Sequence, residues 1–136
     1  MNNLEKEFAP YEESFELKKL GFDEPCFTYY KNDQLSDILE LVKNSEMENV
    51  NNEVDDYISA PTFSQAFRWF REKYNLAHRI TISSSKFISY DITEVKEHSH
   101  KSLYFTICSL DGANTYEGAE LACLKKLIEI VKNTKP

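Results

Sequence analysis

Glycine is scarce in this 136-residue sequence: only Gly21, Gly112 and Gly118 are present, and they lie far apart. P-loops and GxGxxG loops need closely spaced glycines to cradle phosphates, so both are excluded. The GxSxG, HExxH, EF-hand and kinase signatures are absent too. We therefore expect no cofactor, no bound metal and no enzymatic activity, although an enzyme without a recognisable motif stays an alternative.

Cysteine is also rare, and long apolar runs are missing. Cys26, Cys108 and Cys123 are an odd number, form no CxxC and lie among apolar neighbours. This pattern indicates buried, reduced thiols in a cytoplasmic protein. No apolar run approaches the roughly 18 residues of a membrane span. The first residues have no basic head and no apolar stretch, so we expect neither a membrane segment nor a signal peptide.

The net charge of −7 is unevenly distributed. Residues 1–60 carry 15 acidic and 5 basic side chains, whereas residues 61–136 carry 8 acidic and 11 basic ones. A dense acidic surface disfavours nucleic acid and can instead imitate its phosphates in the basic groove of a protein partner. The alternative is that these acids only keep the chain soluble. The expected surface acids are Glu12, Glu13, Glu16, Asp23, Glu24, Asp33, Asp37 and Glu40.

Periodicity predicts a single α+β domain over residues 1–136. Residues 1–43 form an acidic helix–strand–helix extension, with helices at 10–20 and 34–43 and a strand at 26–30, and residues 44–60 form a surface loop. Residues 61–136 form an α-β-β-β-α core, with helices at 62–75 and 115–133, strands at 79–83, 87–93 and 103–108, and a link over 97–101. We expect both core helices on one face of a three- to four-stranded antiparallel sheet, which strand 26–30 can extend.

Apolar spacing identifies the buried faces of the core. An aromatic stripe recurs at helical intervals in the first core helix, at Phe63, Ala66, Phe67, Phe70 and Tyr74. In the last strand, Leu103, Phe105 and Ile107 alternate with Tyr104, Thr106 and Cys108, which predicts that the first set faces the core. Gly21 and Asn75 can end helices in the left-handed conformation, and Thr115 can cap the start of the last helix.

Trp69, the only tryptophan, lies about 120° around its helix from the aromatic stripe. Exposed next to Arg68, it would be a binding anchor, because Trp and Arg dominate interface hot spots. The alternative is that it packs beneath the 44–60 segment. Basic residues of the second half could contact phosphates, with Trp69 or Tyr104 stacking a base. The alternative is that they form only a solvated surface. These basic residues are Arg68, Arg71, Lys73, Arg79, Lys125 and Lys126.

Two further features have alternative interpretations. His98 and His100 would share one side of a strand end and could bind a metal, but zinc needs three or four ligands. A solvent-exposed hairpin is the other interpretation. Tyrosines are plentiful, and an exposed one such as Tyr116 can contribute to an interface.

Three blocks of the chain are similar to a family of short uncharacterised proteins encoded by bacteriophages and prophages. The blocks are residues 20–26 (LGFDEPC), 65–74 (QAFRWFREKY) and 116–131 (YEGAELACLKKLIEIV), about a quarter of the chain. The resemblance implies a phage or prophage setting and a location in the host cytoplasm. It implies no activity and no site residue.

The element order of residues 62–133 is similar to that of double-stranded-RNA-binding domains. Ala119-Glu120 and Ala122-Cys123 fit that family's last helix, which opens with a Lys-Lys pair that grips phosphates. Tyr116 and Glu117 stand at the positions of that pair. The resemblance implies the fold, without the lysines that RNA binding needs.

We therefore expect a non-enzymatic, phage-type accessory protein that binds a host or phage protein through an acidic and aromatic surface. The residues that we expect to carry this contact are Glu12, Glu13, Glu16, Arg68, Trp69 and Tyr116. A nucleic-acid-binding module and a small-molecule-sequestering protein are the alternatives. The sequence leaves a homodimer open.

Overall fold

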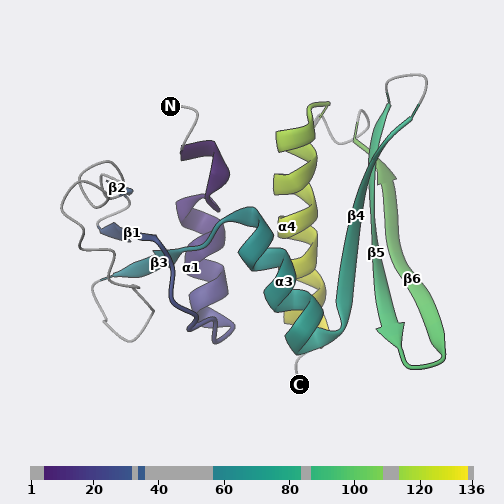
Figure 1. Ribbon diagram of the computed structural model, residues 1–136, viewed down its shortest axis with the longest axis horizontal. Helices are drawn as coiled ribbons and strands as arrows, with labels where there is room; N and C mark the ends of the chain where they lie inside the picture. Colours follow the sequence, from purple (N-terminus) through teal and green to yellow (C-terminus); the bar gives the residue numbers. More distant parts are fainter. Residues whose placement is uncertain (1–4, 32–33, 36–56, 84–86, 109–113, 135–136) are drawn as a thin grey trace. The chain divides into compact units, whose positions relative to one another are not determined.

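The computed structural model describes residues 5–31, 34–35, 57–83, 87–108 and 114–134. The chain divides into two compact units, Met1–Gln65 and Ala66–Pro136. The predicted α+β class is confirmed. In chain order the elements are the 3-10 helix η1 (Glu5–Glu7), helix α1 (Tyr11–Lys19), strands β1 (Thr28–Lys31), β2 (Gln34–Leu35) and β3 (Ile58–Ala60), helix α3 (Phe63–Tyr74), strands β4 (Leu76–Ile82), β5 (Ile88–Lys96) and β6 (Ser99–Ile107), and helix α4 (Tyr116–Thr134) (Figure 1).

Gly21 terminates helix α1 of the first unit in the left-handed conformation, as the sequence predicts. Gly21 has a φ of 99°, which a residue without a Cβ adopts without a clash. Its N–H donates to the Lys18 carbonyl at 3.0 Å, and the Phe22 N–H donates to the Leu17 carbonyl at 2.9 Å. These two bonds form a Schellman motif. Leu17 and Phe22 are buried, so the end of α1 contributes to the core of the first unit.

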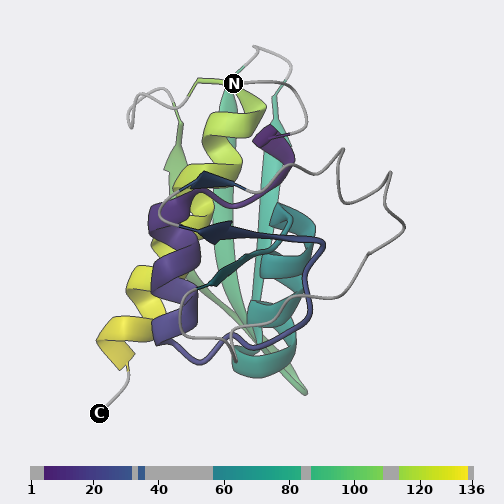
Figure 2. The ribbon, with the colours of Figure 1, turned by 90° about the vertical axis from the view of Figure 1, so that its left-hand side faces the viewer.

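Strand β1 belongs to a small antiparallel sheet of the first unit, in the order β2-β1-β3 (Figure 2). Tyr30 of β1 pairs with Leu35 on one side and with Ile58 on the other. The prediction that strand 26–30 extends the large sheet is therefore wrong. Its β-branched and aromatic residues form a strand as expected, but the backbone partners come from the first unit itself.

Two other boundaries in the first unit also differ from the prediction. Residues 34–35 form β2 instead of opening a helix, and residues 58–60 form β3 instead of ending a loop. Both strands are too short to produce a period-two pattern that the sequence would reveal. The rest of the predicted helix, 36–43, and of the predicted loop, 44–56, lies outside the described residues.

The second unit contains the predicted antiparallel sheet, in the order β4-β5-β6. Helix α4 and the part of α3 that belongs to this unit lie on one face of the sheet (Figure 1). Phe67 and Phe70 of the aromatic stripe are buried, as are Tyr90 and Ile92 of the central strand and Leu127 of α4. The predicted two-helix cover of one sheet face is thus confirmed. Among the described residues, no helix combines the length and apolarity needed to cross a membrane.

From Tyr104 onward, the register of β6 reverses the predicted faces of that strand. Tyr104 lies opposite Ile92 and Phe105 opposite Asp91, and the register shifts next to Ile92, where Thr93 pairs with Ser102. Phe105 is 61% exposed, so its predicted burial is wrong. An irregularity of one residue moves every later side chain to the opposite face, and alternation alone does not reveal where it lies.

The strands also begin and end at positions other than those predicted. Asn75 has a φ of 58° and ends α3 in the left-handed conformation, as predicted. Strand β4 starts directly after it, at Leu76, earlier than the predicted residue 79. Only Glu97 and His98 form the β5–β6 turn, because β6 begins at Ser99 and includes the last three residues of the link predicted over 97–101.

The cap of α4 gives a stability test. The Thr115 Oγ1 atom accepts a hydrogen bond from the Gly118 N–H at 3.0 Å. Thr115→Ala removes this acceptor and should lower the free energy of unfolding by about 1 kcal/mol, measured by urea denaturation followed by circular dichroism. Thr115→Ser keeps the oxygen and should retain most of the stability. An equal loss in both variants would contradict the capping role.

Candidate functional site

Trp69 is not an exposed anchor, because only 5% of its surface is accessible. Its indole ring meets the rings of Phe70 and Tyr74 edge-on, with centroids 5.1 and 5.4 Å away. The Lys73 ammonium lies 5.1 Å from the centroid of the indole. Of the two interpretations of Trp69, exposure is therefore wrong: α3 is buried on the side of Trp69 as well as along its aromatic stripe. A partner cannot reach the indole in this conformation.

The acids proposed for the surface of the first unit have different environments. Glu12 is exposed, whereas Glu13 is buried, which corrects its predicted exposure. The Glu16 carboxylate accepts the Lys19 ammonium at 3.0 Å. Asp23 is exposed and Glu24 is half-buried, whereas Asp33, Asp37 and Glu40 lie outside the described residues. Glu12 and Glu16, one turn apart, are thus the acids of α1 that the structure leaves accessible.

Arg68 and Tyr116 belong to the second unit, and both are exposed. Two of the cations proposed for phosphate contact are instead engaged within that unit. The Arg79 Nε atom donates to the Asp91 carboxylate at 3.0 Å. The Lys126 ammonium lies 4.3 Å from the centroid of the Tyr104 ring and 3.3 Å from the Glu129 carboxylate. These pairs reduce the cationic surface available to a nucleic acid.

The main chain of Ala9 fixes the start of α1. The Ala9 N–H donates to the Pro61 carbonyl at 2.8 Å. The Ala9 carbonyl accepts the Tyr30 hydroxyl at 2.8 Å and the Ser14 hydroxyl at 3.1 Å. Burial, together with the nearby carboxylates of Glu5 and Glu13, raises the pKa of Tyr30 to about 12. The Tyr30 hydroxyl therefore stays protonated and keeps donating at physiological pH.

A row of aromatic rings leads from this buried hydrogen bond to the surface. The Tyr30 ring meets the Tyr11 ring edge-on, with centroids 5.6 Å apart. Tyr11 stacks on Phe15 with centroids 6.3 Å apart and an interplanar angle of 23°. The Lys19 ammonium lies 5.0 Å from the Phe15 centroid. Phe15 is 41% exposed and has a supporting group one helical turn away on each side.

We call the exposed side of α1, made of Tyr11, Glu12, Phe15, Glu16 and Lys19, the α1 surface. Phe15 and Leu17 lie on opposite sides of α1. At about 100° per residue, Phe15 and Leu17, which are two positions apart in the sequence, lie about 160° apart around the helix. Leu17 is fully buried, so this angle alone could have indicated that Phe15 faces solvent.

The three cysteines are free and buried, as the sequence predicts. Burial raises the pKa of Cys26 to about 12, and the nearby Glu24 charge adds to the increase. Burial also raises the pKa of Cys123. All three histidines lie between residues 78 and 100, so the first unit holds no imidazole to activate Cys26. Cys26 and Cys123 therefore lack the thiolate character of a nucleophile.

His78 is packed inside the second unit. Its ring stacks on Phe67 with centroids 3.7 Å apart. Burial and, to a smaller extent, the Arg71 charge lower the pKa of His78 to about 4, whereas the Asp91 charge acts in the opposite direction. The ring is therefore neutral at pH 7 and contributes to packing rather than to surface charge.

His98 and His100 form no cluster of metal ligands. Both are exposed, and the His98 Nε2 atom lies 4.0 Å from a Glu97 carboxylate oxygen. Across the described ranges, no three His, Cys, Asp or Glu side chains gather where they could hold a metal ion. One carboxylate oxygen, Glu24 Oε2, and one hydroxyl oxygen, Tyr74 Oη, are buried without a hydrogen-bond partner in these ranges.

The reactivity of the thiols tests whether the three cysteines are buried as described. In the folded protein at pH 8, all three should react much more slowly with a chromogenic disulfide reagent than in the urea-unfolded chain, because burial disfavours the thiolate and blocks access. Thiol titration by absorbance measures both rates. A thiol of the folded protein that reacts at the unfolded rate would show that the cysteine environments described above are wrong.

The depressed pKa of His78 predicts a loss of stability in acid. Between the ordinary pKa of 6.5 and about 4, the unfolded chain binds a proton that the folded chain does not. The stabilisation from neutral His78 is therefore complete above pH 7 and is lost as the pH falls from 6.5 through 4.

His78→Phe keeps a ring against Phe67 and removes the titrating group. Urea denaturation from pH 7 to about pH 4.5 should show a smaller loss of unfolding free energy in His78→Phe than in the wild type. His98→Phe, at the exposed turn, is the control and should follow the wild type. Parallel pH profiles for wild type and His78→Phe would exclude this role of the imidazole.

No family model, no curated protein and no solved structure matches the chain.

Proposed function

We propose that this chain is a non-enzymatic, phage-type accessory protein that binds a host or phage protein through the acidic and aromatic α1 surface. The observation that carries the proposal is Phe15, 41% exposed and supported by Tyr11 and Lys19 at its sides. The phage setting rests on the resemblance of the three sequence blocks. The α1 surface retains Glu12 and Glu16 of the six residues expected from sequence. Of the other four, Trp69 and Glu13 are buried, and Arg68 and Tyr116 belong to the second unit.

The support around Phe15 favours a binding role for its ring. A side chain that is already held in one position loses little conformational entropy when a partner covers it. The Tyr11 ring on one side and the Lys19 ammonium on the other hold Phe15 in this way, and Lys19 is itself held by Glu16 at 3.0 Å. Aromatic anchors of this kind provide a large part of the energy of protein interfaces.

The charges around the ring indicate the chemistry of the partner. Glu12 is exposed on the same side of α1 as Phe15, one turn before it. Among the described residues, no cation forms an ion pair with the Glu12 carboxylate, whereas Glu16 is paired with Lys19. A partner that offers an apolar pocket for Phe15 with a lysine or arginine at its rim would match this surface, and the charge would speed their association.

Site-specific photocrosslinking tests the proposal. A photoreactive phenylalanine analogue at position 15 should crosslink one host or phage protein in a cell lysate, and the same analogue at position 105 should not. Phe105 is the control because it is 61% exposed but belongs to the second unit.

Affinity measurements with the crosslinked protein then test individual side chains. Phe15→Ala should weaken binding by about fivefold or more, and Phe105→Ala should leave it unchanged. Glu12→Gln should slow association and reduce its dependence on salt. If Phe15→Ala binds as tightly as the wild type, or Phe105→Ala weakens binding more, the α1 surface is not the contact.

The α-β-β-β-α order of the second unit supports a second proposal, a nucleic-acid-binding module. Tyr116 and Glu117 begin α4 where a phosphate-binding helix would present cations, so the protein contact is favoured. Titration with duplex RNA and with single strands at two salt concentrations distinguishes the two. Binding that weakens steeply with salt would support nucleic acid, and no binding at low salt would exclude it.

A further inference from the structure

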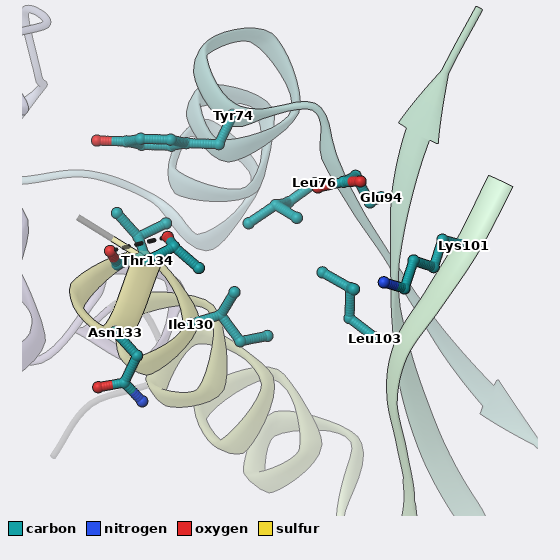
Figure 3. Close-up of a pocket in the computed structure, with 9 residues that line it drawn as sticks. Tyr74, Leu76, Glu94, Lys101, Leu103, Ile130, Asn133 and Thr134 are labelled. Atoms are coloured by element: carbon teal, nitrogen blue, oxygen red, sulfur yellow. Dashed lines mark hydrogen bonds between the residues drawn. The ribbon is translucent and has the colours of Figure 1, made fainter. Parts of the chain in front are cut away.

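The second unit contains a cavity of about 470 Å³. It lies where the end of α3, the start of β4, the β5–β6 hairpin and the last turns of α4 meet (Figure 3). Ligand pockets measure roughly 300–1,000 Å³ and have mostly apolar walls with a few polar groups. The walls of this cavity fit that description: its apolar lining comes from Tyr74, Leu76, Leu103, Ile130 and Val131.

A carboxylate and an ammonium group lie on the strand side of the cavity. Glu94 of β5 and Lys101 of β6 are register partners and both line it. The Glu94 carboxylate is already bound by the Lys96 ammonium at 3.2 Å. Lys101 has no ion pair with any described residue, and Figure 3 shows its ammonium directed toward Leu103 and the interior of the cavity. A cation beside apolar walls is therefore left for a ligand.

The opposite side of the cavity has the opposite electrostatic character. The last turns of α4 line it, and the carbonyl end of a helix carries a partial negative charge. One of these carbonyls, that of Val131, accepts the Thr134 hydroxyl at 3.1 Å. Lys132 belongs to the same last turns but does not line the cavity, so Lys101 is the lining cation that would attract an anionic group on a ligand, which defines one orientation.

We propose that this cavity binds a small amphipathic carboxylate. Its hydrocarbon part lies against Leu76, Leu103 and Ile130, and its carboxylate meets the Lys101 ammonium. The site consists entirely of residues of the second unit, so it stands independently of the α1 surface. A protein that contacts its partner through α1 could carry such a ligand at the same time.

Octanoate, octylamine and octanol test the proposal as probes with one chain length and three charges. Each is titrated below its micelle concentration into full-length isotope-labelled protein, and binding is followed by NMR. Octanoate should bind tightest, with saturable shifts of the Leu76, Leu103 and Ile130 signals. The absence of saturable shifts, or tighter binding of octylamine than of octanoate, would overturn the proposal.

Charge variants test the role of Lys101. Lys101→Met should weaken octanoate binding by roughly two- to fivefold, the range of an exposed ion pair, and leave octanol binding unchanged. Lys101→Glu should invert the preference, so that octylamine binds tighter than octanoate. Lys125→Glu makes the same change on the exposed side of α4, outside the lining, and is the matched control.

The variants also separate a local effect from a loss of folding. Lys101 is exposed, so its substitutions should preserve the dispersed amide spectrum of the wild type. An equal loss of octanoate binding in Lys125→Glu and Lys101→Glu would show only a general charge effect and would overturn the site. Inversion in Lys101→Glu alone supports it.

Discussion

The arrangement of the first unit depends on the main chain of Ala9. Its N–H group is bound by the carbonyl of Pro61, and its own carbonyl receives the hydroxyls of Tyr30 and Ser14. One residue thus joins three segments: the start of α1, strand β1 and the chain between β3 and α3. Ala9 is completely buried, where hydrogen bonds without competing water fix geometry most strongly.

The exposed aromatic ring of α1 follows from that junction. Tyr30 is held by its hydroxyl, Tyr11 meets Tyr30, and Phe15 stacks on Tyr11. The surface ring is therefore connected to the core by ring contacts rather than by a flexible side chain alone. The cavity of the second unit has a different basis, since its walls are the ends of elements and its cation lies on a β-strand. Protein contact and ligand binding would then be properties of separate parts of the chain.

Regular elements with long periodic patterns could be predicted from the sequence. The aromatic stripe of α3 and the left-handed residues Gly21 and Asn75 occur as expected, because each depends on local geometry. Strands β2 and β3 could not be predicted, because two or three residues carry no period and their pairing depends on distant segments.

The candidate site was predictable only in part. Glu12 and Glu16 were identified from charge, but burial of Glu13 and Trp69 depends on packing between elements that one helix pattern does not reveal. Phe105 is exposed and Tyr104 faces inward because of a single register shift, which has no sequence signature here. Phe15, by contrast, could have been found from helical angles alone.

The burial of Trp69 has a practical consequence for spectroscopy. It is the only tryptophan in the chain, it is 5% exposed, and it is in contact with aromatic rings and an ammonium group. Its fluorescence emission therefore comes from one site in the interior of the protein and should shift to longer wavelength when α3 is exposed to water. The unlabelled chain carries its own optical reporter of folding, at a residue that is itself part of neither the α1 surface nor the cavity lining.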